Sequence, residues 1–505
     1  MRGKILFVTG TEAASSVRRH SDGIVHVCSV DVAALLSMDR IGAELSKINL
    51  NGFSMIILPG LVSGDTSRLS KILGVPVYKG TKHSSDIRLL IENLGSVKLS
   101  TRIPADYALD GKLRENVKSH LEASYKKGKK FVMRIGVKRP VYLGKNSPMR
   151  VIAEIPDAPL LSRNDLKDMA EHYVKSGASI VDIGMISGVD NSKKIKNIVR
   201  VLRDSVNVPL SIDSMDVNEI TAAVDAGVDL VLSVAESNIE VAETIDVPFV
   251  ILPLDRRGKL PECAVERVKK LESLMTVLKG KHIILDPVLS PLNHGFVESL
   301  KAYSMLKGKY PRIPVVMGIG NITELVDADS VGMNALLAGV ASEIGLELLF
   351  TVEASVKTQG CVRELSTAAD MMHLAKIHGK NPKDLGLDLL EIKDKRKTEL
   401  IEDPKTARLK YMKAKDNPVK MEQIKYRIYL RKNEILVTGY SKNQPTRGYK
   451  GTSAEVLYKK ICSTTKISPE HAAYLGKELA KAEIALKLNK NYEQDEELFH
   501  GFNKT

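Results

Sequence analysis

Carboxylates, small residues and one asparagine recur at the ends of apolar runs in the middle of the chain. The set is Asp182, Gly184, Asp213, Ser214, Ser233, Glu236, Asp255, Asp286, Pro287, Gly320, Asn321 and Glu353. A charged group beside a buried strand costs free energy unless it has a partner. Helix capping would explain one such residue, such as Asp213 or Ser214. Several together indicate a ligand, and a carboxylate can accept paired hydrogen bonds from a flat, amidine-bearing heterocycle. The pattern favours such a heterocycle over a phosphate or a metal.

The stretch VVMGIGNITELVDADSVGMNALLAG (315–339) contains one of these strand ends. Its apolar run stops at Gly318, Gly320 and Asn321, and a helix-like segment follows. Glycine lets a backbone approach another group closely, and asparagine offers both a donor and an acceptor. These properties suit a ligand at a strand end, and a plain turn is the alternative.

Strand-like runs alternate with amphipathic helical patterns through this part of the chain. The eight runs are RVIAEIP, SIVDIGMI, PLSIDSM, LVLSVAE, PFVILPLD, HIILDPVLS, PVVMGIGN and ELLFTVEAS. Eight such repeats match a (β/α)8 barrel, whose functional groups gather at the C-terminal strand ends. A doubly wound sheet is the alternative, but closure is more economical, so we predict a TIM barrel over 149–375.

The predicted fold class is α/β, with this barrel flanked by two smaller parts. Residues 1–148 read as a flavodoxin- or Rossmann-like doubly wound domain plus a connector. Residues 376–420 read as a charged helical linker, and 421–505 as a small α+β module whose closing helix starts at Ser468 and Pro469. The first domain has no GxGxxG or GxxxxGK[ST] motif, so its polar strand ends favour turns and caps over a nucleotide site.

Composition narrows the partners of this 505-residue chain. A formal charge of +14 favours anionic partners. However, no base-reading motif and no Trp are present, so we expect no nucleic acid. The four cysteines form no CxxC pair, which predicts reduced thiols in a cytoplasmic protein without a metal. No apolar run approaches the roughly 20 residues that span a bilayer, so no membrane contact is expected. A second copy of this chain, in a homodimer, is among the candidate partners.

Three segments resemble the pterin-binding barrel family of dihydropteroate synthases and methyltetrahydropterin methyltransferases. SIDSMDVNEITAAVDAGVDLVLSV is similar to the family's strand that ends in Ile-Asp-Ser or Val-Asp-Thr before a helix. IILDPVLSPL resembles its Leu-Asp-Pro strand, and GIGNITELVDADSVGMNALLAG looks like the Gly-x-Ser-Asn stretch of the methyltransferase branch. The whole chain resembles the archaeal dihydropteroate synthase-like proteins.

The resemblance implies roles for individual residues. Asp286 would hold the amino and N3 edge of the pterin, and Asp213 would contact the ring from another side. Asn321 would hydrogen-bond near N5, and Ser233 stands where relatives often have Asn, with Asn238 further on. The implied substrate-binding residues are Asp182, Asp213, Ser233, Asp286, Gly318, Gly320 and Asn321, of which Asp213 and Asn321 are also catalytic candidates.

Three segments of this chain differ from the motifs of the family's synthases, and the differences affect which reaction the resemblance implies. EIPDAPLLS, GMISGVDNS and GIGNITE stand where the synthases have Asn-x-Thr-Pro-Asp-Ser-Phe-like, Ser-Thr-Arg-Pro and Ser-Arg-Lys motifs. The resemblance therefore favours methyl or one-carbon transfer from a reduced pterin, tetrahydromethanopterin or tetrahydrofolate, with Asn321 polarising N5. The alternatives are dihydropteroate synthase-type condensation in carrier biosynthesis, a non-catalytic pterin-binding or scaffold protein, and a barrel serving another small substrate.

The methyl acceptor would come from outside this chain. No histidine has an aspartate two residues before it, so the corrinoid-ligand motif Asp-x-His-x-x-Gly is absent from the sequence. A corrinoid would have to be carried by a partner protein, and another methyl-acceptor protein is the alternative.

Overall fold

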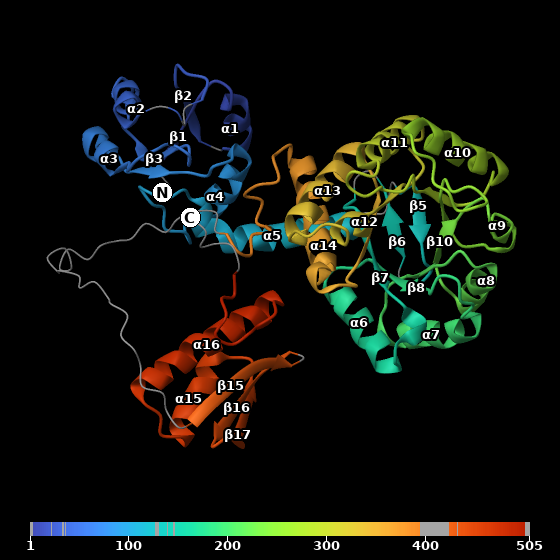
Figure 1. Cartoon of the computed structure of the whole chain (residues 1–505). Helices are drawn as coiled ribbons and strands as arrows, with labels where there is room; N and C mark the ends of the chain where they lie inside the picture. Colours follow the sequence, from blue (N-terminus) through green and yellow to red (C-terminus); the bar gives the residue numbers. More distant parts are fainter. Residues whose placement is uncertain are drawn as a thin grey trace. The chain divides into compact units, whose positions relative to one another are not determined.

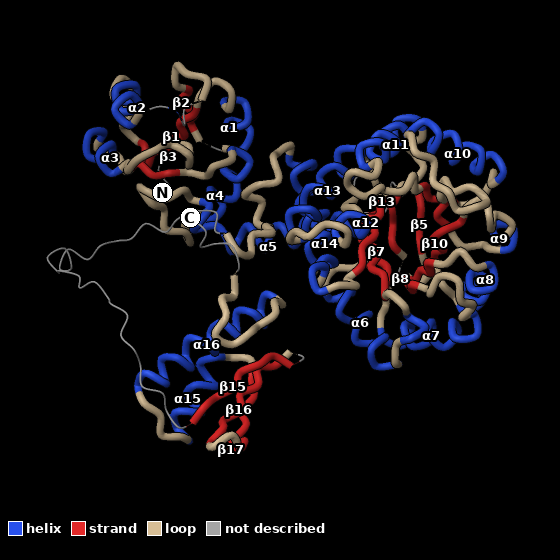
Figure 2. Tube along the Cα trace, in the orientation of Figure 1, coloured by secondary structure: helices blue, strands red, loops and turns tan. Residues whose placement is uncertain are grey.

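The computed structural model describes residues 4–21, 23–32, 35, 37–126, 131–138, 140–144, 147–393, 424–431 and 433–499. Most of the expected linker, 394–420, lies outside these residues. The chain forms two compact units, one of 1–352 with 360–389 and one of 353–359 with 390–505. Figure 1 shows the elements along the chain, and Figure 2 shows which are helices and which are strands.

Eight parallel strands form the central sheet of the first unit. They are β7 (Arg150–Ile155), β8 (Ile180–Gly184), β9 (Leu210–Asp213), β10 (Leu230–Val234), β11 (Phe249–Ile251), β12 (Ile283–Leu285), β13 (Val316–Gly318) and β14 (Leu348–Val352). Their order is β12-β11-β10-β9-β8-β7-β14-β13, and a parallel bridge between Leu285 and Val315 joins the two ends. The predicted (β/α)8 barrel is thereby confirmed.

Helices surround this barrel (Figure 2). They are α6 (Arg163–Lys175), α7 (Ser192–Ser205), α8 (Val217–Ala226), α9 (Val241–Thr244), α10 (Ala264–Val277), α11 (Phe296–Lys309), α12 (Gly320–Thr323), α13 (Ser330–Ile344) and α14 (Cys361–His378). The cap of α8 is Asp216, which accepts hydrogen bonds from the backbone N–H groups of Asn218 and Glu219. Neither Asp213 nor Ser214 has that role, because both precede the cap.

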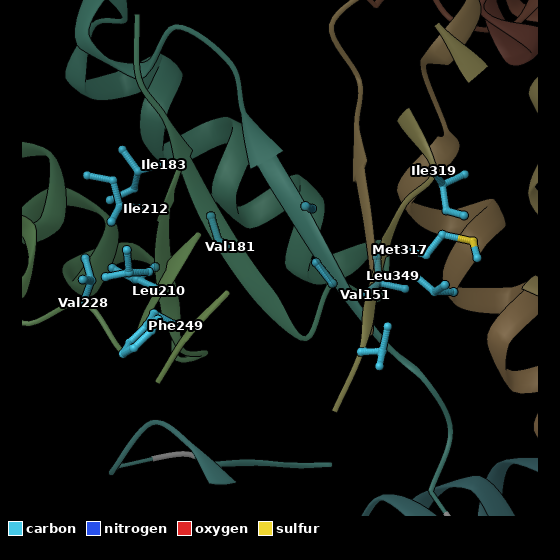
Figure 3. Packing of buried hydrophobic residues seen from close by; sticks show 14 of the residues in the cluster. Val151, Val181, Ile183, Leu210, Ile212, Val228, Phe249, Met317, Ile319 and Leu349 are labelled. Atoms are coloured by element: carbon cyan, nitrogen blue, oxygen red, sulfur yellow. The ribbon is translucent and has the colours of Figure 1, made fainter. Parts of the chain in front are cut away.

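Two apolar layers build the barrel. Side chains that point outward from the strands pack under the helices, as Val181, Leu210 and Leu349 do in Figure 3. Side chains that point inward, such as Ile152 and Ile180, pack against a hairpin of β5 (Met133–Ile135) and β6 (Val141–Leu143). The hairpin and these inward residues form a separate buried cluster, so the interior of the barrel is filled by side chains.

The N-terminal part is a doubly wound domain, as predicted. Its parallel sheet has the order β2-β1-β3-β4. The elements are β1 (Lys4–Thr9), α1 (Ala14–His20), β2 (Ile24–Val27), α2 (Met38–Leu45), β3 (Phe53–Leu58), α3 (Ser67–Leu73), β4 (Val77–Lys79), α4 (Ile87–Asn93) and then α5 (Asp106–Lys126). A cavity of about 270 Å³ lies beside the carboxyl ends of its strands, where ligands bind in such sheets.

The second unit contains the predicted α+β module. An antiparallel sheet of β15 (Ile424–Arg431), β16 (Glu434–Ser441) and β17 (Gln444–Gly451) packs with α15 (Ala454–Thr464) and α16 (Pro469–Leu488). Ser468 caps α16 by accepting a hydrogen bond from the backbone N–H of His471. Leu475, Leu479 and Ala482 lie on one face of α16 and are buried, so this apolar face packs in the core of the module. None of the described helices has the length and apolar character to cross a membrane.

A buried ion pair stands beside the junction that closes the barrel. Lys307 Nζ lies 2.6 Å from Glu347 Oε1, and both side chains are nearly inaccessible to solvent. The other oxygen of Glu347 accepts the backbone N–H of Val315, whose residue bridges to β12. Lys307 also donates to the carbonyl of Ile313. The pair therefore links α11, the start of β13 and the start of β14.

Replacing Lys307 by methionine should leave Glu347 charged and buried without its partner. We expect Lys307→Met to lower the free energy of unfolding by about 3–5 kcal/mol, measured by urea-induced unfolding with circular dichroism. Lys309→Met is the matched control, because Lys309 pairs with Glu272 on the surface and should cost less than about 1 kcal/mol. Equal losses in the two variants would contradict this role for the buried pair.

Candidate functional site

Three carboxylates project from neighbouring strands into the upper part of the barrel. Glu154 on β7 is level with Asp182 on β8, and Asp213 on β9 is level with Gly184. Successive side chains in a strand alternate between its two faces. Glu154 therefore faces inward like Ile152, two residues before it, and Asp182 faces inward like Ile180. The apolar interior thus ends in a layer of acids at the carboxyl ends of the strands.

We call Glu154, Asp182 and Asp213 the acid cluster. Hydrogen bonds satisfy only some of its carboxylate oxygens. Ser211 donates to Asp182 Oδ1 over 2.5 Å, and Ser233 donates to Asp213 Oδ1. Asp182 is fully buried, and its Oδ2 has no hydrogen-bond partner. Among the described residues, no lysine or arginine forms an ion pair with Glu154, Asp182 or Asp213. The three carboxylates therefore lack a countercharge from the described protein.

Burial raises the pKa values of all three groups, and the charges of neighbouring acids add to this effect at Glu154 and Asp182. The pKa of Glu154 rises from 4.5 to about 8, first through burial and then through the charge of Asp213. The pKa of Asp182 is well above its ordinary value for the same reasons, and burial also raises the pKa of Asp213. At neutral pH the cluster keeps at least one proton, which can be donated to a ligand.

Gly184 makes room for Glu154. A side-chain Cβ at position 184 would lie 2.9 Å from the carbonyl oxygen of Ile155 and closer still to Glu154 Oε1. Glycine at this strand end is therefore a steric requirement. Gly184 belongs to the set predicted from the sequence and Glu154 does not, although a lone acid in the apolar run RVIAEIP was a usable signal.

Asp286 follows β12 and stands in a loop that is braced from behind. Its Oδ1 accepts hydrogen bonds from Tyr303 Oη and from the backbone N–H of Val288, both over 2.7 Å. Burial raises its pKa to about 6, and the charge of Asp213 acts in the same direction. Asp286 therefore belongs electrostatically to the same cluster as Asp213.

Arg267 holds the Asp286 loop in a strained conformation. Arg267 is 2% exposed, and its guanidinium donates to the carbonyls of Pro287 and Val288. Val288 has φ +65°, which is unfavourable for a β-branched residue. The bonds from Arg267 offset this strain. Neither Arg267 nor Tyr303 was a predicted site residue, since each comes from a helix distant in sequence.

Asn321 lies on α12, directly beyond β13. Its Nδ2 donates to the carbonyl of Leu289 over 2.8 Å, which ties α12 to the Asp286 loop. The side chain is exposed, and its Oδ1 accepts no hydrogen bond from the described residues. A Cβ at Gly318 would be only in ordinary contact with Asn321, 3.7 Å away, and one at Gly320 would lie 3.4 Å from Val352. These glycines contribute open space at the strand end.

Ser233 faces the acid cluster, and Asn238 does not. Ser233 has φ +71° and bonds to Asp213. Asn238 is buried, where it accepts from the backbone N–H of Ala235 and donates to the carbonyls of Met215 and Ser233. Asn238 therefore shapes the loop after β10 and leaves Ser233 as the polar group of that strand end.

Other members of the sequence-derived set have separate roles. Ser214 donates to Glu219 of α8 over 2.5 Å. Glu236 is paired with Lys270, and Asp255 accepts backbone hydrogen bonds from Arg257 and Lys259 within its own exposed loop. Glu353 lies in 353–359, which groups with the second unit. Of the strand-end residues predicted from the sequence, the structure therefore brings only a smaller number together at the acid cluster.

Comparison with known proteins adds independent information. The family model described as pterin binding enzyme matches residues 158–323, and PterinBD-DUF4346 matches 423–495. The uncharacterized protein MJ0107 of Methanocaldococcus jannaschii is 34% identical over 525 residues, covering 98% of this chain and 99% of the relative. The chain belongs to the pterin-binding family.

More distant similarities cover about half of this chain or less. The folic acid synthesis protein fol1 of Schizosaccharomyces pombe is 27% identical over 183 residues, which cover 30% of this chain and 24% of fol1. A Yersinia pestis dihydropteroate synthase with a pterine–sulfa conjugate has a TM-score of 0.40 and 17% identity, covering 48% of this chain and 100% of its own. The dihydropteroate synthase of Thermus thermophilus has a TM-score of 0.37 and 18% identity, covering 47% and 97%.

The raised pKa of Glu154 predicts a pH-dependent stability. Its carboxyl keeps a proton in the folded state that the unfolded chain releases above pH 4.5, so stability falls as the pH rises toward about 8. Glu154→Gln cannot ionise and should gain stability relative to the parent between pH 5 and pH 8.5, by roughly 4 kcal/mol. Urea unfolding at both pH values measures this. An equal difference at pH 5 and 8.5 would show that Glu154 has an ordinary pKa.

Proposed function

We propose that the acid cluster binds a reduced pterin that carries a one-carbon unit. The observation that carries this proposal is the buried, unpaired oxygen of Asp182 among carboxylates without a countercharge. Buried polar groups are normally hydrogen-bonded, so such a site favours a ligand rich in N–H donors. The guanidine-like edge of a pterin supplies adjacent N–H and NH₂ groups. Membership of the pterin-binding family supports the same ligand.

Asp286 is the proposed partner of that edge. Because Tyr303 and the backbone of Val288 both donate to Oδ1, its other oxygen is oriented by two fixed contacts. Charge-assisted hydrogen bonds between a carboxylate and paired donors are stronger than neutral ones and add geometric specificity. Asp182, Asp213 and Ser233 would contact the ring from the β8–β10 side of the barrel. Gly318 and Gly320 leave space beside Asn321.

Methyl or one-carbon transfer is the proposed reaction. In methyl transfer from N5, the acceptor forms a new bond to carbon while the electron pair of the N5–CH₃ bond stays on nitrogen. Protonation of N5 before or during the breaking of this bond makes the nitrogen a better leaving group, because it then departs as a neutral amine. Glu154 holds a proton at neutral pH, and Asn321 presents an exposed amide on α12. We propose Glu154 as the proton source, and Asn321 as the group that polarises N5.

Experiments can distinguish the candidate pterin carriers and methyl acceptors. The carrier would be of the tetrahydromethanopterin or tetrahydrofolate type, and a corrinoid or another methyl acceptor would be bound to a partner protein. Synthase-type condensation would instead require a pterin diphosphate and an arylamine, and product formation from that pair would replace the methyl-transfer proposal. Pterin binding without either reaction would favour a non-catalytic binding or scaffold protein.

The binding proposal is tested by calorimetric titration with tetrahydrofolate, tetrahydromethanopterin and their N5-methyl forms. We expect micromolar affinity, with Asp286→Ala weakening it at least about 10-fold, since lost charge-assisted hydrogen bonds cost about 1.5–3 kcal/mol each. Asp255→Asn is the control, because Asp255 is an exposed strand-end carboxylate outside the cluster. Absence of binding to every form, in protein shown to be folded, would refute the pterin proposal.

The catalytic role of Asn321 makes a separate prediction. Asn321→Ala should reduce methyl transfer to free cob(I)alamin, used as a surrogate acceptor, on the order of 100-fold. Its affinity for the N5-methyl pterin should change little, because the pterin edge is held elsewhere. The variant also loses the bond to Leu289, so binding is measured on the same protein. Equal losses of affinity and turnover would contradict a role at N5.

A further inference from the structure

Three potential metal ligands meet in the N-terminal domain, outside the barrel. His26 lies on β2, and Cys28 follows two residues later. Residues two apart in an extended chain point to the same side, and the ligand atoms of both residues lie close to that of Glu44 on α2. Cys28 packs with Ile41 and Leu45 of α2. The fold therefore brings an imidazole, a thiol and a carboxylate together from two elements.

The distances are close to those of a coordination sphere. His26 Nε2 lies 3.8 Å from Glu44 Oε2, and the ligand atoms of all three residues lie within 4.8 Å of one another. Around a tetrahedral Zn²⁺ with bonds of about 2.0–2.3 Å, neighbouring ligand atoms are roughly 3.3–3.6 Å apart. Side-chain movements of about 1 Å or less would bring the present atoms to that spacing. No rearrangement of β2 or α2 is needed.

The imidazole nitrogen that faces this group lacks a hydrogen-bond partner. His26 Nε2 is shielded from solvent and makes no hydrogen bond, although the nearest carboxylate oxygen is 3.8 Å away. A shielded polar nitrogen without a partner is costly and calls for an explanation such as a missing water or ion. A cation between His26, Cys28 and Glu44 would give this nitrogen a partner, while Glu44 Oε2 already accepts the backbone N–H of Ser29.

We propose that His26, Cys28 and Glu44 bind one Zn²⁺ ion. A thiolate combined with an imidazole suits zinc, whereas Ca²⁺ and Mg²⁺ prefer oxygen ligands. Cys28 is fully buried, while the side chains of His26 and Glu44 are 25% and 19% exposed. The fourth coordination position is therefore on the solvent side, where a water or a small ligand completes the tetrahedron. The site would also fasten β2 to α2, and it does not depend on the pterin proposal.

The test uses the full-length, tag-free protein after treatment with a chelator. Titration with Zn²⁺ against a chromophoric competitor, and metal analysis after dialysis, should give about one tightly bound ion per chain. Co²⁺ in place of Zn²⁺ should produce a thiolate-to-metal charge-transfer absorption. Cys28→Ser should abolish that band and weaken Zn²⁺ binding at least about 100-fold, since changes to groups that merely support metal ligands already cost 10–100-fold.

Matched variants separate this site from adventitious binding. Cys462→Ser removes an exposed cysteine and should leave stoichiometry, affinity and the Co²⁺ band unchanged. Glu44→Gln keeps the size of a half-buried side chain and should weaken Zn²⁺ binding even if Cys28→Ser fails to fold. Less than half an ion per chain, or binding unaffected by Glu44→Gln and His26→Gln, would overturn the proposal. So would a Co²⁺ band that survives in folded Cys28→Ser protein.

Discussion

Closure of the eight-stranded sheet determines where every functional group of the barrel can stand. Parallel strands leave unpaired edges unless the first and last strands meet, and here β12 and β13 meet through Leu285 and Val315. Closure brings eight carboxyl ends to one rim. Below that rim, inward side chains pack on the β5–β6 hairpin, so apolar side chains fill the interior. Acids placed above such a floor experience strong electrostatic effects.

The barrel treats its buried charges in two different ways. Near the closing junction, Glu347 has an ion-pair partner in Lys307 and a backbone donor in Val315, and both oppose the rise in its pKa that burial causes. At the rim, no cation compensates Glu154, Asp182 and Asp213, and burial raises the pKa of each carboxyl. A buried charge with a partner of opposite charge recovers part of its desolvation free energy. Buried acids without such a partner, with raised pKa values, are typical of functional sites. This contrast supports the assignment of the acid cluster, and not the buried ion pair, to ligand binding.

The loop after β12 shows how support from distant elements creates a precise site. Asp286 is oriented by Tyr303 from α11, and the loop itself is held by Arg267 from α10. The positive φ of Val288 is maintained by these contacts. The N-terminal domain has a similar arrangement, because Glu44 of α2 lies beside the side chains of His26 and Cys28 at the end of β2. In both places a helix supplies the group that makes a strand end chemically specific.

The amino-acid sequence by itself determined the fold class and the main strand ends. The apolar runs and the helical spacing between them predicted the barrel, and Asp182, Asp213 and Asp286 were found because each stands at the end of such a run. The sequence also showed that Ser468 and Pro469 begin the last helix, because capping depends on neighbouring residues. Periodicity and caps are local, so they can be read along the chain.

Only the tertiary structure decided which polar residues act together. Glu154 belongs to the acid cluster because the strand register places it level with Asp182. Glu236 and Asp255 do not belong to it, because Glu236 pairs with Lys270 and Asp255 accepts a backbone hydrogen bond from Lys259. His26, Cys28 and Glu44 became neighbours only when α2 packed on β2. Such groupings depend on long-range packing and on burial, which sets their protonation. Neither quantity is encoded in the spacing of residues along one chain.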